Sequence, residues 1–193
     1  MEGASETVKN PMIEVRIHGR GGQGAVTSAE LMALAAIDEG KYAQAFPSFG
    51  PERRGAPVVA FLRVSDDQIR VRSKVYQPDV VVVLDPTLLN IVDVSAGLKP
   101  KGTVIINSAK SAEQLQKQYG FKGRLATVDA TKIAMEEMRV PITNTTMLGA
   151  LIKATGMIRL PSMEKPLKAR FGKIAERNQK SMQRAYEETA IRE

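Results

Sequence analysis

The sequence of 193 residues contains no cysteine. This absence excludes disulfides, thiol catalysis and any zinc site or iron–sulfur cluster held by cysteine within the chain. The single histidine, His18, cannot form a metal site of several histidines, and a Ser/His catalytic arrangement with a spare base is disfavoured. We therefore assign no catalytic residue and no metal ligand to this chain.

Long hydrophobic runs are also missing. No stretch approaches the roughly 20 apolar residues of a membrane-spanning helix, and residues 1–10 lack the apolar core of a signal peptide. We expect residues 1–11 to form a disordered tail. The hydrophobic content of 43% supports one well-buried core, so we expect a single domain over residues 12–193 in a cytoplasmic protein that binds no membrane.

Aromatic residues make up only 5% of the chain, whereas the formal net charge is +7. The lysines and arginines are scattered, and no aromatic side chains are interleaved with them for base stacking. We therefore expect no nucleic-acid partner, although steeply salt-dependent binding to RNA or DNA would support that alternative. A basic surface also suits acidic partner proteins and anionic cofactors.

Strand-like and helix-like segments alternate along the chain. This alternation predicts a three-layer α/β/α fold with a mostly parallel, mixed sheet, one hairpin insertion and a C-terminal helix. The hairpin is expected from segments 57–64 and 69–72, which flank a turn. The other strands are expected at 12–18, 42–46, 80–84, 103–107 and 124–128, and the helices at 23–39, 88–94, 112–119, 132–139, 144–155 and after Pro161.

Several polar residues at the ends of these segments have a structural interpretation. We expect Asp79, Asp85 and Asp129 to cap backbone N–H groups at strand ends and helix starts. Asn144 is expected to cap the helix that follows it. His18 ends the first strand, where a hydrogen-bonded structural role is commoner than catalysis.

The segment GRGGQG, residues 19–24, lies between the first strand and the first helix. Three of its glycines match the G-x-G-x-x-G spacing of dinucleotide-binding turns, which bring backbone N–H groups and a helix N-terminus close to a phosphate. An arginine and a glutamine add further donors. The alternative is that the glycines only allow the helix to pack tightly on the sheet. We predict a cofactor-binding loop formed by Gly19, Arg20, Gly21, Gly22, Gln23 and Gly24.

A nicotinamide cofactor is poorly supported by the residues that follow. The acid that holds a ribose hydroxyl is expected about 20 residues after the loop, at the tip of the second strand. Asp38 and Glu39 come earlier, at the end of the first helix, where they are expected to be solvated. A stand-alone dinucleotide-binding protein stays as an alternative, which stabilisation by NAD would favour.

A second unusual segment, FPSFGPERRGAP, spans residues 46–57. Its three prolines and two glycines exclude regular structure, and it carries aromatic and arginine side chains, which are common anchors of protein interfaces. A compact loop whose phenylalanines pack into its own core is the alternative. We predict an interface formed by Phe46, Phe49, Glu52, Arg53 and Arg54.

The two loops in this order resemble the gamma subunits of the 2-oxoacid:ferredoxin oxidoreductases, the family of pyruvate:ferredoxin oxidoreductase. The resemblance covers approximately residues 13–191 and includes the valine-rich strand that ends in Asp85 and the NTTMLGA segment at 144–150. It implies a subunit of a complex that decarboxylates a 2-oxo acid, transfers the acyl group to coenzyme A and reduces ferredoxin.

The resemblance also implies which groups the complex uses. It implies that thiamine diphosphate with magnesium and [4Fe-4S] clusters belong chiefly to the other subunits, alpha, beta and delta. The lack of cysteine and of a thiamine diphosphate motif in this chain agrees with that expectation. The glycine loop would line the approach to coenzyme A and the active site, or it would dock against the thiamine-binding subunit. Pyruvate is the expected substrate, with branched-chain 2-oxo acids as the alternative.

Overall fold

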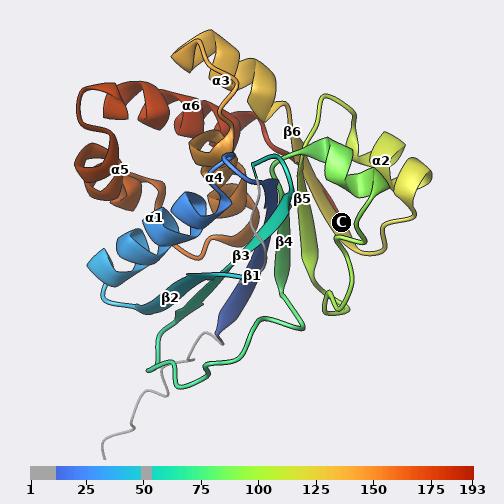
Figure 1. The fold of residues 1–193 in the computed structure, drawn as a ribbon, viewed down its shortest axis with the longest axis horizontal. Coiled ribbons are helices and arrows are strands. Elements are labelled where there is room, and N and C mark those ends of the chain that lie inside the picture. The colour runs from blue at the N-terminus through green and yellow to red at the C-terminus, as the bar shows by residue number, and fades with distance from the viewer. Residues whose placement is uncertain (1–11, 49–53) are drawn as a thin grey trace, which may run out of the picture.

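The computed structural model describes residues 12–48 and 54–193, and within them seven strands form one sheet (Figure 1). The expected tail at 1–11, and Phe49, Glu52 and Arg53 of the second loop, lie outside the described residues. The strands are β1 (Ile13–Arg20), β2 (Tyr42–Pro47), β3 (Pro57–Ser65), β4 (Val80–Val83), β5 (Thr103–Asn107), β6 (Arg124–Val128) and β7 (Ala190–Arg192). The α-helices are α1 (Ala25–Asp38), α2 (Ala112–Tyr119), α3 (Ala130–Met138), α4 (Asn144–Thr155), α5 (Glu164–Phe171) and α6 (Ala175–Glu188), and the 3-10 helices are η1 (Pro86–Asn90), η2 (Leu160–Met163) and η3 (Gly172–Ile174).

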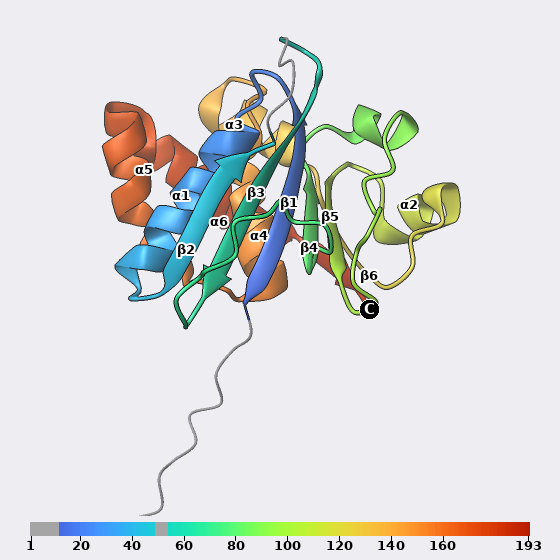
Figure 2. The ribbon, with the colours of Figure 1, turned by 60° about the horizontal axis from the view of Figure 1, so that its bottom comes forward.

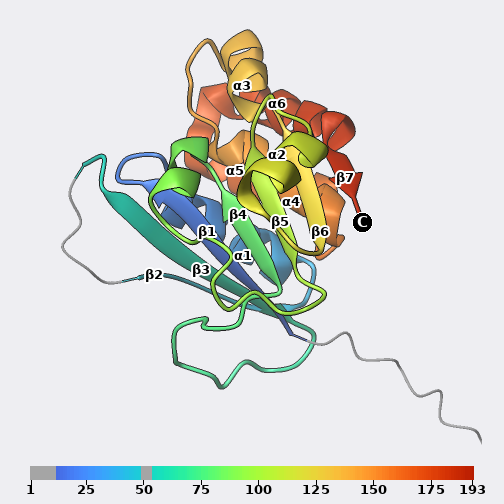
Figure 3. The same cartoon turned by 90° about the vertical axis from the view of Figure 1, so that its right-hand side faces the viewer.

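The sheet is mixed, with the order β2-β3-β1-β4-β5-β6-β7. β1, β4, β5 and β6 run parallel, whereas β3 is antiparallel to both β1 and β2, and β7 is antiparallel to β6. All four valines of β4 are buried, as expected for a central strand covered on both faces. Helices α1, α4, α5 and α6 lie on one side of the sheet and α2 on the other (Figures 1 and 3). The expected three-layer α/β class is confirmed.

Different helices pack against the two faces of the sheet. The larger apolar core joins one face to α1 and α4, through residues such as Val15, Ile17 and Met147. A smaller core joins the opposite face of β4, β5 and β6 to α2, around Leu115. Over β1 and β3 this opposite face is mostly polar, with Phe61 also buried there, and Arg63 of β3 is buried in a 2.8 Å ion pair with Glu14. The smaller apolar core thus covers only one half of the opposite face.

Residues 66–79 connect β3 to β4 and cross the polar half of the sheet without forming a helix or strand (Figure 2). The predicted strand at 69–72, and its hairpin with 57–64, are therefore wrong. Strand β3 lies between β1 and β2, so both of its edges are already occupied and no further strand can pair with it. The antiparallel hairpin of the fold is formed by β2 and β3 instead.

Other boundaries also differ from expectation. The helix expected at 88–94 is the shorter η1, and the C-terminal helix is divided into α5 and α6 at Gly172, whose φ is +52°. The three-residue β7 was not predicted. Asn144 lies inside α4, and the cap position belongs to Thr143. The cap expected of Asp129 is confirmed, because its carboxylate accepts from the Lys132 N–H at 3.0 Å.

Helices α4 and α6 approach each other closely. A β-carbon on Gly149 of α4 would lie 2.0 Å from the main-chain oxygen of Met182 in α6. Two buried polar contacts flank this point: Thr145 donates to Asn178 at 2.7 Å, and the hydroxyls of Thr146 and Ser181 are 2.6 Å apart. Within residues 12–48 and 54–193, no helix has the length and apolar character needed to cross a membrane.

Candidate functional site

The two sequence motifs meet at the carboxyl end of β1. The Gly21 N–H donates to the Ala56 oxygen at 2.9 Å, and the Gly55 N–H donates to the Gly21 oxygen at 3.2 Å. Arg20 Nη1 also donates to the Gly55 oxygen at 3.0 Å. These contacts follow directly after the β1–β3 pairing, which ends with Arg20 opposite Pro57. The glycine loop and the end of the second loop therefore form one structural unit.

Asp85 anchors the glycine loop from the side of β4. Its Oδ2 accepts from Arg20 Nε at 3.0 Å and from Gln23 Nε2 at 2.9 Å. Its Oδ1 accepts from the N–H and hydroxyl of Thr87, which confirms the expected capping role. Burial raises the pKa of Asp85, but the hydrogen bonds from Thr87 and Gln23 and the Arg20 charge outweigh it, and the net pKa is lowered. The carboxylate therefore stays ionised and holds Arg20 in place.

This network lies between the carboxyl ends of β1 and β4. The helix that follows β1 covers one face of the sheet, and the segments that follow β4 and β5 cover the other, so this position is a topological switch point, where α/β folds commonly bind ligands. Here the side chains of Arg20 and Gln23 turn inward to Asp85. A ligand of the loop would therefore meet backbone groups first.

The opposite side of the glycine loop faces a cavity of about 390 Å³, within the size range of small-ligand sites. Gly22 has φ +92° and no atom near the position of a β-carbon, so only glycine suits this open turn. Gly24 has φ +80° and lies against the Asn144 side chain, so packing also favours a glycine at this position. Helix α1 begins behind it with no side-chain cap and no acidic residue in its first turn.

The wall opposite the loop comes from the connection between α3 and α4 and from the segment around η3. It carries the apolar side chains of Ile142 and Phe171 and two exposed arginines, Arg170 and Arg177. No carboxylate lines the cavity, whose walls belong to the described part of the chain. Unpaired N–H groups at a helix start together with two guanidinium groups favour an anion, and the apolar wall favours a ligand with an apolar part.

Arg170, Arg177, Ile142 and Phe171 were not predicted as site residues. They lie more than 100 residues beyond the glycine loop in the sequence and belong to no motif. For Arg170, Phe171 and Arg177 the signal was the basic and helical character of the chain after Pro161, and for Ile142 there was none. Their position depends on how α5 and α6 fold back along α4.

The predicted interface residues are only partly described. Phe46 is half-buried at the end of β2, where its ring lies 5.3 Å from the ring of Phe61 and beneath the Arg63 guanidinium. Arg54 is exposed beside Gly21. Phe46 thus packs within its own chain, and a partner contact through Arg54 stays a prediction.

His18 lies on the polar face of the sheet. It is 5% exposed, and its Nε2 accepts from Arg16 Nε at 3.1 Å. Arg16 in turn donates to the backbone oxygens of Val94 and Ala96. This engagement favours the structural role expected for His18. In the part of the chain that the structure describes, no three acidic or histidine side chains gather closely enough to hold a metal ion.

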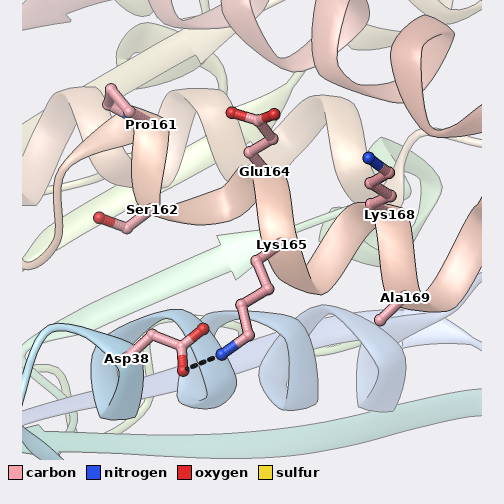
Figure 4. Close-up of a pocket in the computed structure, with 7 residues that line it drawn as sticks. All are labelled: Asp38, Pro161, Ser162, Glu164, Lys165, Lys168 and Ala169. Atoms are coloured by element: carbon pink, nitrogen blue, oxygen red, sulfur yellow. Dashed lines mark hydrogen bonds and ion pairs between the residues drawn. The ribbon is translucent and has the colours of Figure 1, made fainter.

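Asp38 and Glu39 lie at the other end of α1, far from the glycine loop. Asp38 pairs with Lys165 at 2.9 Å across an open hollow between α1 and α5 (Figure 4). Glu39 accepts from the Arg159 N–H at 2.6 Å and from the Ser162 hydroxyl. These acids hold the end of α1 against η2 and α5, so neither is placed to bind a ribose at the loop.

Comparison with known proteins agrees with these features. The family model described as pyruvate ferredoxin/flavodoxin oxidoreductase matches residues 14–188. The chain is 55% identical to the "Pyruvate/ketoisovalerate oxidoreductases common subunit gamma" of Thermococcus kodakarensis, over 94% of this chain and 100% of that protein. It is 51% identical to the "Pyruvate synthase subunit PorC" of Methanothermobacter thermautotrophicus, over 92% and 96%.

A solved structure of a related subunit has the same fold. The crystal structure of pyruvate oxidoreductase subunit PORC from Thermotoga maritima is 40% identical and superposes with a TM-score of 0.85, over 95% of this chain and 100% of that one. The family model and the relatives extend over nearly the whole described sheet and its helices. The chain therefore belongs to the pyruvate ferredoxin/flavodoxin oxidoreductase family.

Proposed function

We propose that this chain is the gamma subunit of a multisubunit enzyme that oxidatively decarboxylates pyruvate, forms acetyl-coenzyme A and reduces ferredoxin. The observation that carries this proposal is the match to gamma and PorC subunits along nearly the full length of both partners. Thiamine diphosphate with magnesium and [4Fe-4S] clusters would reside on alpha, beta and delta subunits. A chain without cysteine fits a role that carries no iron–sulfur cluster.

The choice of 2-oxo acid is part of the same proposal. The relatives named as common to pyruvate and ketoisovalerate oxidoreductases support a gamma subunit that does not select the substrate side chain. Pyruvate is the substrate we propose, since the PorC relatives are named for pyruvate synthase. We place the complex in the cytoplasm, where coenzyme A and ferredoxin are found.

The cavity beside the glycine loop suits coenzyme A. Coenzyme A carries a pyrophosphate and a further phosphate, and when bound it supplies the thiol that accepts the acyl group. Arg170, Arg177 and the N-terminus of α1 would hold the phosphates. Ile142 and Phe171 would pack against its apolar parts, while Asp85 keeps the loop in position. The rival role for this loop is docking against the thiamine-binding subunit.

Replacing Arg170 and Arg177 by alanine in the assembled enzyme is expected to raise the KM for coenzyme A about tenfold or more, since a hydrogen bond to a charged group contributes about 1.5–3 kcal/mol. The KM for pyruvate should stay unchanged. Steady-state kinetics with pyruvate, coenzyme A and ferredoxin measures both constants. Lys173→Ala is the matched control, because Lys173 is exposed on the same segment and does not line the cavity. An unchanged KM for coenzyme A with weakened subunit association would instead support the docking role.

Reconstitution tests the function as a whole. Mixing this chain with the thiamine- and cluster-containing subunits of its source cell should restore pyruvate- and coenzyme A-dependent reduction of ferredoxin, and omitting it should abolish the reaction. The chain should co-purify with those subunits. Turnover of a nicotinamide-linked substrate by the isolated chain would overturn the proposal and favour the stand-alone dinucleotide-binding protein.

A further inference from the structure

The segment 66–79 presents a basic surface at the end of the sheet opposite the glycine loop. It begins where β3 ends and reaches the start of β4, passing over β3 and β1 (Figure 2). The eight residues of β1 separate the two ends of the sheet by about 26 Å, at roughly 3.3 Å per residue. We define residues 69–76 as the basic strap.

The basic strap is attached to the sheet at several points. Arg63 Nη2 donates to the Ser73 oxygen at 2.8 Å, and Val75 is 3% exposed. Just beyond the strap, the Lys99 N–H donates to the Pro78 oxygen at 3.1 Å. Gly97 lies so close that a β-carbon there would be 2.3 Å from the Tyr76 oxygen. These contacts place the strap in one conformation, which lowers the entropic cost of binding a partner.

The outward side of the strap carries cations and apolar groups. Arg70, Arg72 and Lys74 are exposed, Val71 is 40% exposed and Tyr76 is 70% exposed. Among the described residues, no carboxylate forms an ion pair with any of these three cations. Arginine and tyrosine are enriched where proteins bind each other, and three neighbouring unpaired charges call for a complementary acidic surface.

The nearby acidic side chains are paired or lie on the other side of the sheet. Asp79 pairs with Lys99 at 2.9 Å. Asp66 lines a small hollow with Lys41 and Met157, on the side of the sheet that α1 covers. Asp67 forms an interaction of its own and is not counted as an available charge. No acidic residue occurs between positions 68 and 78, so the strap itself has a charge of one sign.

We propose that the basic strap docks against an acidic, partly apolar surface of another subunit of the same complex, with Arg70, Arg72 and Lys74 facing carboxylates and Tyr76 filling an apolar recess. The inference rests on the proposed function, because it requires the chain to work within that assembly. A protein partner is favoured over single-stranded nucleic acid because the strap offers one aromatic ring, whereas nucleic-acid grooves stack successive bases on several. Docking here leaves the cavity beside the glycine loop open.

Charge reversal tests the proposal. The variant R70E/R72E/K74E is compared with K117E/K132E/K173E, which reverses three exposed lysines on other surfaces and changes the net charge equally. Affinity for the remaining subunits is measured by analytical ultracentrifugation between about 50 and 300 mM salt. The strap variant should bind at least about tenfold more weakly and lose much of the salt dependence, while the control stays within about threefold of the wild type. Tyr76→Ser should weaken binding without altering the salt dependence.

The results of these binding measurements distinguish failure of the strap proposal from failure of the proposed gamma-subunit function. Equal affinities for the strap variant and the control would overturn the strap proposal while leaving the subunit assignment intact. Loss of binding to polyuridylate or to anionic lipid vesicles, with subunit affinity unchanged, would also overturn it and assign the strap to nucleic acid or to a membrane. Failure of the wild-type chain to associate with those subunits would overturn both proposals. The unfolding midpoints of all variants are measured first. A loss of affinity is assigned to the strap only in a variant whose midpoint equals that of the wild type.

Discussion

Acidification from pH 7 to pH 4 is expected to lower the free energy of unfolding by about 3 kcal/mol through His18 alone. Burial, followed by the neighbouring Arg16 charge, lowers the pKa of His18 from 6.5 to about 4, against a smaller opposing effect of Asp93. The unfolded chain therefore binds a proton near pH 6.5, while the folded chain binds it only near pH 4. The His18 contribution to the free energy of unfolding therefore rises with pH between about 4 and 6.5 and is constant above pH 6.5.

The variant His18→Gln isolates this contribution. Glutamine can accept the Arg16 hydrogen bond through its amide oxygen, and it does not titrate. Urea unfolding of wild type and variant at several pH values gives two stability profiles. Their difference should grow by about 3 kcal/mol between pH 7 and pH 4, because the contributions of Asp85 and other carboxylates cancel. Parallel profiles would show that His18 binds its proton equally well in the folded and the unfolded chain, and therefore that its buried contact with Arg16 is wrong.

Local patterns were sufficient to predict the core of the fold. Valine-rich β4 and the small-residue helix α1 were predicted because burial on both faces and helical spacing leave a direct mark in the sequence. The glycine loop was predicted for the same reason, since Gly22 needs a positive φ that glycine alone adopts readily. In these cases the structure depends on residues that are close in the sequence.

The wrong or missing predictions concern residues whose positions depend on contacts with segments far away in the sequence. The alternation in residues 69–72 is typical of a strand, but pairing requires a free strand edge, and β1 and β2 leave none on β3. Asn144 has the side chain of a helix cap, yet it lies against Gly24, which is 120 positions earlier. The arginine wall of the cavity was missed because Arg170 and Arg177 reach the loop only after α5 and α6 fold back.

Replacing Gly149 by alanine is expected to destabilise the chain by about 2–3 kcal/mol, even though alanine favours a helix by about 1 kcal/mol over glycine. The new β-carbon would lie 2.0 Å from the Met182 oxygen and 2.8 Å from the Tyr186 nitrogen, so α4 and α6 must move apart. The buried contacts Thr145–Asn178 and Thr146–Ser181 would then lengthen. Denaturant unfolding of the purified variant measures the loss.

Gly40→Ala is the matched control for this variant. Gly40 has φ +82° but nothing near its β-carbon position, so the cost is conformational strain of about 1–2 kcal/mol without a clash. Adding Met182→Ala to Gly149→Ala should not restore stability, because the obstructing atom belongs to the main chain. Since α6 also carries Arg177, separating the helices should also weaken the proposed binding of coenzyme A. A wild-type unfolding midpoint for Gly149→Ala would mean that α4 and α6 are not in contact at this position.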